Sequence, residues 1–347
     1  TFVVDPGRWR VEVERQMSSP NPWTIAFNRW GGQFQMYGGG NIAYVSAYSG
    51  WTPMRVSHGG FAGIGGGGKG CGLEILSSRH FPDEWQQGLI SNHLLGYNAV
   101  LVQPLKEAGA GYANQGKIEL IRSEDLAFRP VDTKVGMDGA IYVADFCNQV
   151  VGHAQYAVRH PDRDHRHGRI WRITYKGRDL LQPPPILNAS ILDLLDLLKS
   201  PEDVVRRNAR IELGKRDDDI VFRYLDEWLN KLDPEDPEYG HHLAEALWIH
   251  QRRYHLDEAF LQRVLRAEDF NARAVATRAL RFWADDLEQP LKRLKQQLND
   301  EHPRVRMEAV IAATWMRRTL SGMDDLLVGV DPGKDRLLNG VINDLDL

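Results

Sequence analysis

The chain has 347 residues, with 43 Lys and Arg against 47 Asp and Glu and a formal net charge of −4 at pH 7. This balance excludes the basic surface that drives nucleic-acid binding, and no apolar run reaches the roughly 18 residues of a membrane span. The length is about twice that of a usual domain, so we expect two folding units. Glycines crowd into the first half, whereas Leu, Arg, Glu, Asp and Ala dominate the second, which is typical of exposed helices.

The first half, residues 1–180, predicts short strands separated by turns. Alternation of apolar and polar residues marks the strands, and Gly31 and Gly32 mark the turn of a hairpin. The predicted strands are Arg8–Arg15, Thr24–Phe27, Gln33–Tyr37, Leu73–Leu76, Gly88–Asn92, Ala99–Gln103 and Lys117–Arg122.

The clearest unit runs from Pro130–Val135 through a Gly-Met-Asp-Gly turn at 136–139 to Ala140–Asp145 and then Arg169–Thr174. A strand, an Asp-Gly turn, a strand ending in Asp and a third strand are typical of a propeller blade. We therefore expect a partial β-propeller of about three blades, too few to close a ring. Even spacing of tryptophans predicts packing between blades rather than stacking on a sugar. These tryptophans are Trp9, Trp23, Trp30, Trp51, Trp85 and Trp171.

A glycine tract, Gly59–Gly70, contains the pattern G-x-G-x-x-G. Dinucleotide binding requires a helix after this pattern, but a strand is predicted from Leu73 onward. A P-loop requires Ser or Thr after Lys69, where the chain has glycine. We expect a flexible loop. The two cysteines, Cys71 and Cys147, either form one disulfide or stay as buried thiols.

Three consecutive prolines, Pro183–Pro185, predict an extended linker over residues 181–189. Beyond it the hydrophobic period changes from two to 3.6, so residues 190–347 predict a helical domain. Ile191–Leu198 opens an amphipathic helix. Ser200 and Pro201 stand where the N-cap and first-turn proline of the next helix are expected.

Three helical segments align with one another: Asp203–Ala209, Phe270–Ala276 and Pro303–Ala309. Each places an arginine, at 206, 273 or 306, one residue after an apolar position and an alanine three residues later. The spacings of 67 and 33 residues predict a divergent fourth copy midway, at His241–Trp248. This interval is typical of HEAT or armadillo repeats, so we expect an α-α solenoid of about four helix pairs. We expect the arginines to bind carboxylates of neighbouring repeats.

The densest polar stretch is Asp145–Arg172, which holds four of the twelve histidines: His153, His160, His165 and His167. On a strand, His165 and His167 would share a face and could bind a metal together with Asp164. Alternatively, Asp, His and Arg in such a loop hydrogen-bond the backbone that joins two blades. A structural role, a cofactor or substrate role and a metal role all stay open at this point.

These residues resemble a known family. Met137–Asp145 and Arg163–Arg172 are similar to the "membrane-bound dehydrogenase" family of Planctomycetes and Verrucomicrobia, as are Leu73–Pro82 and His241–Trp248. That family joins a propeller like those of sorbosone and soluble glucose dehydrogenases to HEAT repeats, and often to a cytochrome c domain. The resemblance implies a six-bladed propeller when complete, export to the periplasm or cell surface, and a chain cut from a larger protein.

The resemblance also implies a PQQ-like quinone with Ca²⁺, oxidation of a sugar or alcohol, and electron transfer to a cytochrome c. In this scheme His153 takes the hydroxyl proton and the cofactor supplies the electron chemistry. The chain has no Cys-x-x-Cys-His, so these residues bind no c-type haem. The implied cofactor-binding residues are Arg129, Asp145, Asn148, Arg159, Arg163, His165 and His167, and the implied Ca²⁺ ligand is Asp164.

Two alternatives compete with a dehydrogenase. One is a non-catalytic scaffold, in which the propeller and the concave side of the solenoid bind a polysaccharide or a partner protein. The other is a hydrolase or lyase that uses a pair of carboxylates such as Asp162 and Asp164.

Overall fold

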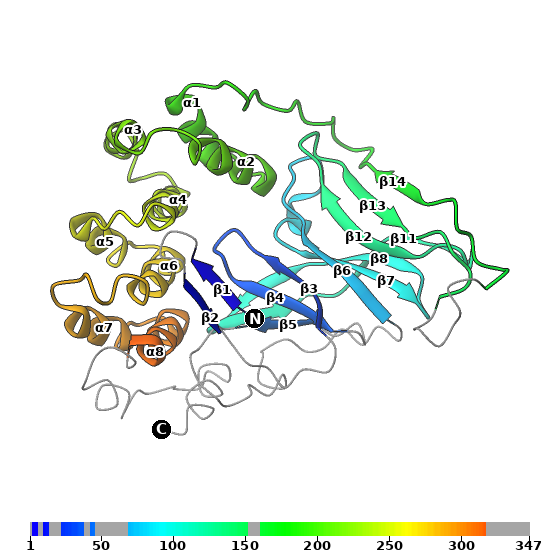
Figure 1. The fold of residues 1–347 in the computed structure, drawn as a ribbon, viewed down its shortest axis with the longest axis horizontal. Coiled ribbons are helices and arrows are strands. Elements are labelled where there is room, and N and C mark those ends of the chain that lie inside the picture. The colour runs from blue at the N-terminus through cyan, green and yellow to red at the C-terminus, as the bar shows by residue number, and fades with distance from the viewer. Residues whose placement is uncertain are drawn as a thin grey trace.

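The structure is a computed structural model and describes residues 2–5, 10–13, 22–37, 42–45, 69–151 and 160–316. Within these residues every strand ends before residue 174 and every α-helix begins after residue 190. Figure 1 shows the sheets and the helices as two adjoining halves of the molecule. Residues 181–189 contain neither helix nor strand, which confirms the predicted change of structure at this point.

The β half consists of antiparallel sheets, three of them larger than a hairpin. The strands of these three are β3 (Pro22–Phe27), β4 (Gln33–Tyr37) and β5 (Ile42–Val45); β6 (Lys69–Ile75), β7 (Leu89–Leu95), β8 (Ala99–Gln103) and β11 (Ile118–Arg122); and β12 (Pro130–Val135), β13 (Ile141–Asp145) and β14 (Arg169–Ile173). Two hairpins pair β1 (Phe2–Asp5) with β2 (Arg10–Val13) and β9 (Leu105–Ala108) with β10 (Gly111–Asn114). The first strands of the three larger sheets are neighbours, with β6 between β3 and β12.

The turn between β12 and β13 forms where the sequence predicts it. Gly139 has a φ of +82°, a conformation that glycine adopts without steric cost. The Asp138 carboxylate accepts a hydrogen bond from the Ala140 N–H at 3.1 Å, and the Gly136 N–H donates to the Ala140 carbonyl at 2.8 Å. Along β13 buried and half-buried residues alternate, as expected of a strand with one face in the core.

The β9–β10 hairpin is not predicted by the sequence, because Lys106 and Glu107 interrupt any apolar alternation in β9. Its stability comes from distant contacts. The buried ring of Tyr112 packs 5.4 Å from the ring of Phe34 and 5.0 Å from that of Tyr44, measured between ring centroids. Local sequence patterns carry no sign of these contacts.

Helices make up the second half. Their bounds are α1 (Ile191–Asp196), α2 (Asp203–Leu213), α3 (Asp218–Asn230), α4 (Tyr239–Arg252), α5 (Glu258–Val264), α6 (Phe270–Leu280), α7 (Pro290–Leu298) and α8 (Pro303–Met316), with short 3₁₀ turns at Asp83–Trp85 (η2) and Leu197–Lys199 (η3). None of the described helices is long and apolar enough to cross a membrane.

The predicted start of α2 is wrong by two residues, since Glu202 and not Ser200 is its N-cap. The reason is a competing set of contacts. The Ser200 hydroxyl donates to the Glu202 carboxylate at 2.9 Å, and the carbonyls of Ser200 and Pro201 accept hydrogen bonds from Arg206. Ser200 and Pro201 therefore belong to the loop that precedes the helix.

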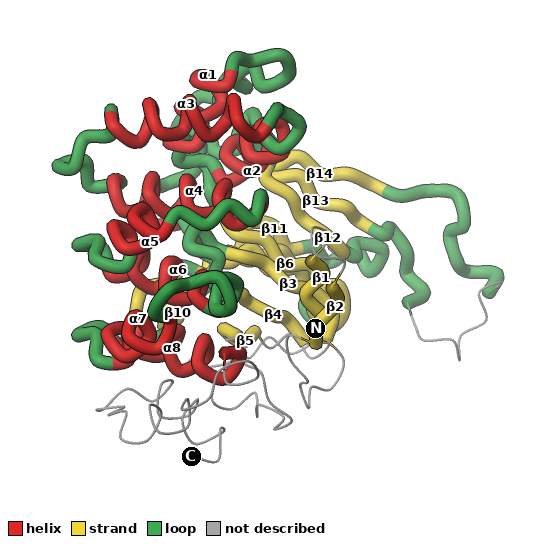
Figure 2. Tube along the Cα trace, turned by 60° about the vertical axis from the view of Figure 1, so that its left-hand side comes forward, coloured by secondary structure: helices red, strands yellow, loops and turns green. Residues whose placement is uncertain are grey.

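The helices stand in two columns. In Figures 1 and 2, α2, α4, α6 and α8 lie next to the sheets, and α3, α5 and α7 lie on the far side. A single apolar cluster contains buried residues of both halves, including Phe34 and Tyr44 from the sheets and Leu247, Ala276 and Val310 from the inner helices. The two halves therefore share one core.

The three aligned arginines make the same contact. One terminal nitrogen of each donates to the carbonyls six and five residues earlier in the chain, at 2.6 to 3.0 Å. Arg206 also binds Glu245 at 3.0 Å, and Arg273 binds Asp300 at 2.8 Å, so two of them reach the next repeat as expected. The divergent copy is helix α4. His242 and Glu245 stand there at the positions of the aligned arginine and alanine.

Three inner helices bind loops of the β half directly. Arg278 of α6 donates to the carbonyls of Trp30 and Gly31 at 3.2 and 3.0 Å. Arg304 of α8 donates to the carbonyls of Ala110 and Gly111 at 3.1 and 2.8 Å. His241 of α4 contacts the Arg29 carbonyl through Nε2 at 3.1 Å. These contacts fix the orientation of the helices relative to the sheets.

Candidate functional site

Asp145, a predicted cofactor ligand, is the centre of a hydrogen-bond cluster in the third sheet. Its side chain is fully buried. One carboxylate oxygen accepts from the N–H groups of Arg129 and Cys147 at 2.8 and 2.9 Å, and the other from Arg169 Nε and the Trp171 indole at 2.8 and 2.9 Å. Burial alone would raise the pKa of Asp145, but the hydrogen bonds, led by that from Trp171, lower it below the usual value.

Arg129, the second predicted ligand, is also buried and bonded within the protein. Its guanidinium donates to the carbonyls of Asn148 at 3.2 Å and Leu94 at 2.9 Å, and to the Asn98 side chain at 3.0 Å. A further contact of 3.4 Å reaches the Gln149 carbonyl. A guanidinium used in this way ties two loops together and is not oriented to hold an anion.

Asn148 and the loop that follows continue this network. The Asn148 amide donates to the Asp164 carbonyl at 3.0 Å. The Asp164 carboxylate accepts from the N–H groups of Arg166 and His167 at 2.9 and 3.1 Å and contacts His167 Nδ1 at 2.8 Å. The Arg166 hydrogen bond is the main reason that the pKa of Asp164 is low. Asp164 thus shapes the loop around residues 164–167.

The described members of the predicted quinone and Ca²⁺ site fall into a buried group and an exposed group. Arg129, Asp145 and Asn148 are buried and use their polar atoms on one another and on the backbone. His165 and His167 are exposed, and the described residues include no group of three His, Cys, Asp or Glu side chains placed to hold a metal. Arg163 is half-buried and its N–H donates to the His160 carbonyl at 3.0 Å.

Two predicted residues, His153 and Arg159, lie outside the described residues. So does most of the glycine tract, residues 59–68. Strand β6 begins at Lys69, so the glycine tract is followed by a strand and not by the helix of a dinucleotide-binding loop. Cys71 and Cys147 are free thiols, which answers the question of a disulfide that the sequence left open.

A cleft of about 540 Å³ lies where the two halves of the molecule meet. It is lined by β3, β6 and β12 from the sheets and by α2 and α4 from the helices. Two apolar side chains of β3 face solvent here, Ile25 with 44% and Phe27 with 53% of their surface exposed. Trp248 of α4 also lines the cleft. Sites at the junction of two structural units with apolar and a few charged groups are the usual place for ligands.

The helix side of the cleft contains a buried ion cluster. Glu245 is fully buried and binds both Arg206 and Arg210. Arg206, 2% exposed, also forms an ion pair with Asp203, and burial lowers its pKa to about 10. The Arg210 guanidinium lies 5.6 Å from the centre of the Trp248 ring. These contacts hold the indole and the arginines in fixed positions.

The sheet side carries a second set of charges. Lys134 Nζ lies 3.3 Å from Glu74 and 3.1 Å from Asp132. Burial alone would lower the pKa of Lys134, but the two carboxylates, Glu74 first, raise it. Together, five of the residues that line the cleft are cationic and three are carboxylates.

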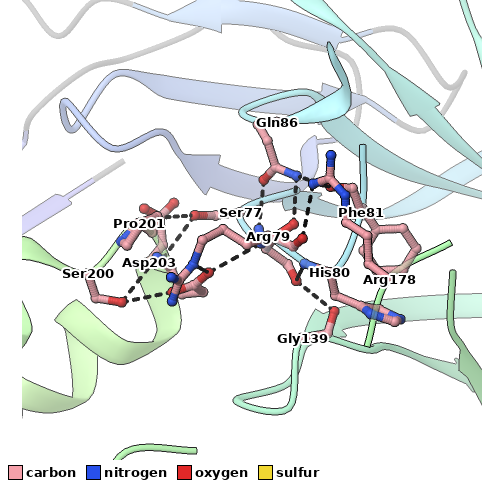
Figure 3. Close-up of polar contacts among 12 residues, drawn as sticks. Ser77, Arg79, His80, Phe81, Gln86, Gly139, Arg178, Ser200, Pro201 and Asp203 are labelled. Carbon is pink, nitrogen blue, oxygen red and sulfur yellow. Dashed lines mark hydrogen bonds and ion pairs between the residues drawn. The ribbon is translucent and has the colours of Figure 1, made fainter. Parts of the chain in front are cut away.

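The segment Ser77–Pro82 lies within Leu73–Pro82, one of the segments that carry the resemblance, and its polar contacts join the β half to the start of α2 (Figure 3). The Ser77 hydroxyl donates to the Pro201 carbonyl at 2.8 Å and accepts from the Asp203 N–H at 3.0 Å. Arg79 binds the buried Glu202 carboxylate through two nitrogens, at 2.7 and 2.9 Å. These bonds position the first turn of α2, which lines the cleft.

His80 anchors the other side of the same segment. Its Nε2 accepts from the Tyr175 N–H at 2.9 Å, so Nδ1 carries the proton and donates to the Asp179 carbonyl at 2.9 Å. Ser78 donates to the Gly139 carbonyl at 2.9 Å, and Arg178 to the Phe81 carbonyl at 2.8 Å, as Figure 3 shows. His80 is therefore a structural residue with both ring nitrogens in use.

The sequence patterns do not single out the residues of the cleft. They place Phe27 in a strand, and Arg207 and Trp248 in helices, without a role at a site. One signal is present: Glu245 replaces the alanine of the repeat, and a carboxylate at a packing position needs cations around it. The other members come together only through the contact between the two halves.

Comparison with known proteins gives no function. A family model described as "Domain of unknown function (DUF7133)" matches residues 43–177, which run from β5 to just beyond β14. No curated protein and no solved structure matches the chain. The matched segment contributes β6 and β12 to the cleft, while β3 and the helices lie outside it.

Proposed function

We propose that the three larger sheets are successive blades of an incomplete β-propeller and that the helices are HEAT-like repeats. The adjacency of β3, β6 and β12, each the first strand of its sheet, supports the propeller, because first strands surround the axis of that fold. The repeated contact of Arg206, Arg273 and Arg306 with preceding carbonyls supports the repeats.

We further propose that the chain is a non-catalytic scaffold that binds a polysaccharide in the cleft between its halves. The observation that carries this proposal is the solvent-facing ring of Phe27, 53% exposed on β3, in a cleft also lined by Trp248. Exposed aromatic rings in a concave site stack on the apolar faces of sugars. Such a module suits the exported location that the family resemblance implies.

The polar stretch supports a scaffold rather than a quinone enzyme. Asp145, Arg129 and Asn148 connect strands and loops through buried hydrogen bonds. A scaffold requires such hydrogen bonds within the protein, because buried polar groups cost stability when they lack hydrogen-bond partners.

Replacing Phe27 by alanine tests the proposed function. We expect Phe27→Ala to weaken binding of an oligosaccharide found on a glycan array by about tenfold, since stacking on one ring contributes roughly 1 kcal/mol beyond its area. Isothermal titration calorimetry measures the change. Phe282→Ala removes another partly exposed ring, 36% exposed, distant in sequence from the cleft residues of β3, and is the matched control.

Two outcomes would count against the scaffold. One is a chain that binds no glycan at all on the array. The other is sugar-dependent dye reduction by the protein after addition of PQQ and Ca²⁺, lost on substitution of His153, which would establish the dehydrogenase instead.

A further inference from the structure

We propose that the cleft selects an anionic saccharide chain, one that carries carboxylates, and that Arg207 provides the selection. This inference rests on the proposed function, because it names the class of glycan that the same cleft would take.

The lining of the cleft is rich in cations. Five cations and three carboxylates line it, in a chain whose net charge is −4. Two further carboxylates, Asp132 and Glu238, lie outside the lining and pair with Lys134 and Arg29, so ion pairs offset most of this positive charge. The attraction of the cleft for an anion therefore depends on a cation that has no carboxylate partner.

Four of the five lining cations have a carboxylate partner. Arg206 and Arg210 bind Glu245, and Lys134 binds Glu74 and Asp132. Arg29, also in the cleft, pairs with Glu238 on α4's N-terminal side. Among the described residues no carboxylate pairs with Arg207, which is exposed. Within that part of the chain, Arg207 is thus the cleft cation without a carboxylate partner, and its exposed guanidinium can donate to a ligand.

The first turn of α2 explains why Arg207 has no carboxylate partner among those residues. Asp203 stands four residues before it on α2, the spacing at which an acidic side chain would normally pair with an arginine. The Asp203 carboxylate instead forms its ion pair with Arg206, whose guanidinium is held in place by Glu245 and by the carbonyls of Ser200 and Pro201. Because Asp203 pairs with Arg206, it does not pair with Arg207, which lines the cleft.

The size and lining of the cleft indicate the kind of anion. A volume of about 540 Å³ falls within the range of small-ligand sites, roughly 300 to 1,000 Å³. A folded protein partner needs a broader surface, about 800 Å² on each side. The exposed Phe27 ring and Ile25 offer an apolar face for sugar rings, and a planar guanidinium forms two hydrogen bonds with a carboxylate. A saccharide with carboxylate groups satisfies both features.

The experiment compares oligogalacturonate with a neutral cello-oligosaccharide of the same length, by calorimetry on the 347-residue chain. We expect the anionic chain to bind at least tenfold more tightly at low ionic strength, with an advantage that shrinks as salt is added. Arg207→Gln should remove this advantage while weakening neutral binding much less, whereas Arg207→Lys should retain part of the advantage. Lys231→Gln, which removes an exposed cation at the end of α3, is the control for net charge.

The outcomes separate this inference from the function on which it rests. Equal affinity for the two saccharides, or a preference that survives Arg207→Gln, would overturn the inference and leave glycan binding intact. Failure of both saccharides, together with an empty glycan array, would remove the proposed function itself. Tighter binding of an oligoglutamate of equal charge would show that the ligand is an acidic peptide and would also overturn the inference. Unchanged thermal unfolding of Arg207→Gln shows that a lost preference is not a loss of fold.

Discussion

Asp145 shows how one buried carboxylate can organise a loop-rich region. Four hydrogen bonds converge on it, from backbone groups at 129 and 147 and from the side chains of Arg169 and Trp171. Charge-assisted bonds of this kind are roughly twice as strong as neutral ones. A cofactor site would contain the same residue types in sequence. Only the hydrogen-bond partners of Asp145 in the fold distinguish its structural role from a cofactor-binding role.

We expect Asp145→Asn to destabilise the protein by about 3 kcal/mol, because the Arg169 guanidinium loses its buried partner. The folded-state pKa of Asp145 lies below its unfolded value of 3.8, so its contribution is present above about that pH and is lost as the pH falls through the folded pKa. Urea unfolding at pH 7 and at pH 3 measures both effects, and the variant should differ less from the wild type at pH 3.

Asp162→Asn is the control for this substitution, since the Asp162 side chain is 77% exposed and has only a distant contact with His160. Its unfolding should match that of the wild type. If Asp145→Asn kept full stability, the structural assignment of Asp145 would be wrong and the cofactor role would regain support.

At the scale of elements, the repeated arginine gives the helical array its regularity. Arg206, Arg273 and Arg306 each close the loop before their own helix, and the first two also bind the following repeat. In α4, the divergent copy, Glu245 replaces the alanine and receives Arg206 and Arg210. The repeat that lacks the arginine therefore carries a carboxylate, Glu245, that binds two arginines of the preceding repeat.

We expect Arg273→Met to cost about 2 to 4 kcal/mol, because it leaves Asp300 and two loop carbonyls without their donor. Chemical denaturation followed by the helical circular dichroism signal measures the loss. Arg266→Met removes an exposed arginine just before the same helix and should change stability by less than about 0.5 kcal/mol. Equal effects of the two substitutions would contradict the assigned role of Arg273.

At the scale of the whole molecule, the two halves hold each other through arginines on the inner helices. Arg304, 3% exposed, donates to the carbonyls of Ala110 and Gly111 and binds Glu107, and its guanidinium lies 4.4 Å from the centre of the Tyr112 ring. Because sheets and helices also share an apolar cluster, we expect the wild type to unfold in one cooperative step.

Arg304→Met should uncouple the β9–β10 hairpin from α8. Hydrogen exchange measured by mass spectrometry should become at least tenfold faster in peptides covering residues 105–114, while peptides covering β12 and β13 stay protected. Lys295→Met, an exposed position on α7, should leave both unchanged. Uniform acceleration throughout the chain would mean that the hairpin is not held locally by Arg304.

The sequence by itself determined the change from strands to helices and many of the elements on each side of it. Alternation predicts the strands around the 136–139 turn, the prolines locate the change at 181–189, and the arginine spacing predicts the helix that the structure shows at 239–252. These features depend on residues a few positions apart, because short stretches of sequence set the backbone preferences and the hydrophobic period. The propeller and HEAT assignments build on the same patterns and stay proposals.

Only the tertiary structure decided which polar residues are available for binding. Asp145 and Arg129 stand out in the sequence as candidate ligands. In the fold, their polar atoms form hydrogen bonds within the protein. Phe27 and Arg207 do not stand out in the sequence. In the fold they line the same cleft, to which they contribute from opposite halves of the molecule. Whether a donor is free depends on every group packed around it, and those groups come from distant parts of the chain, so no local pattern records the answer.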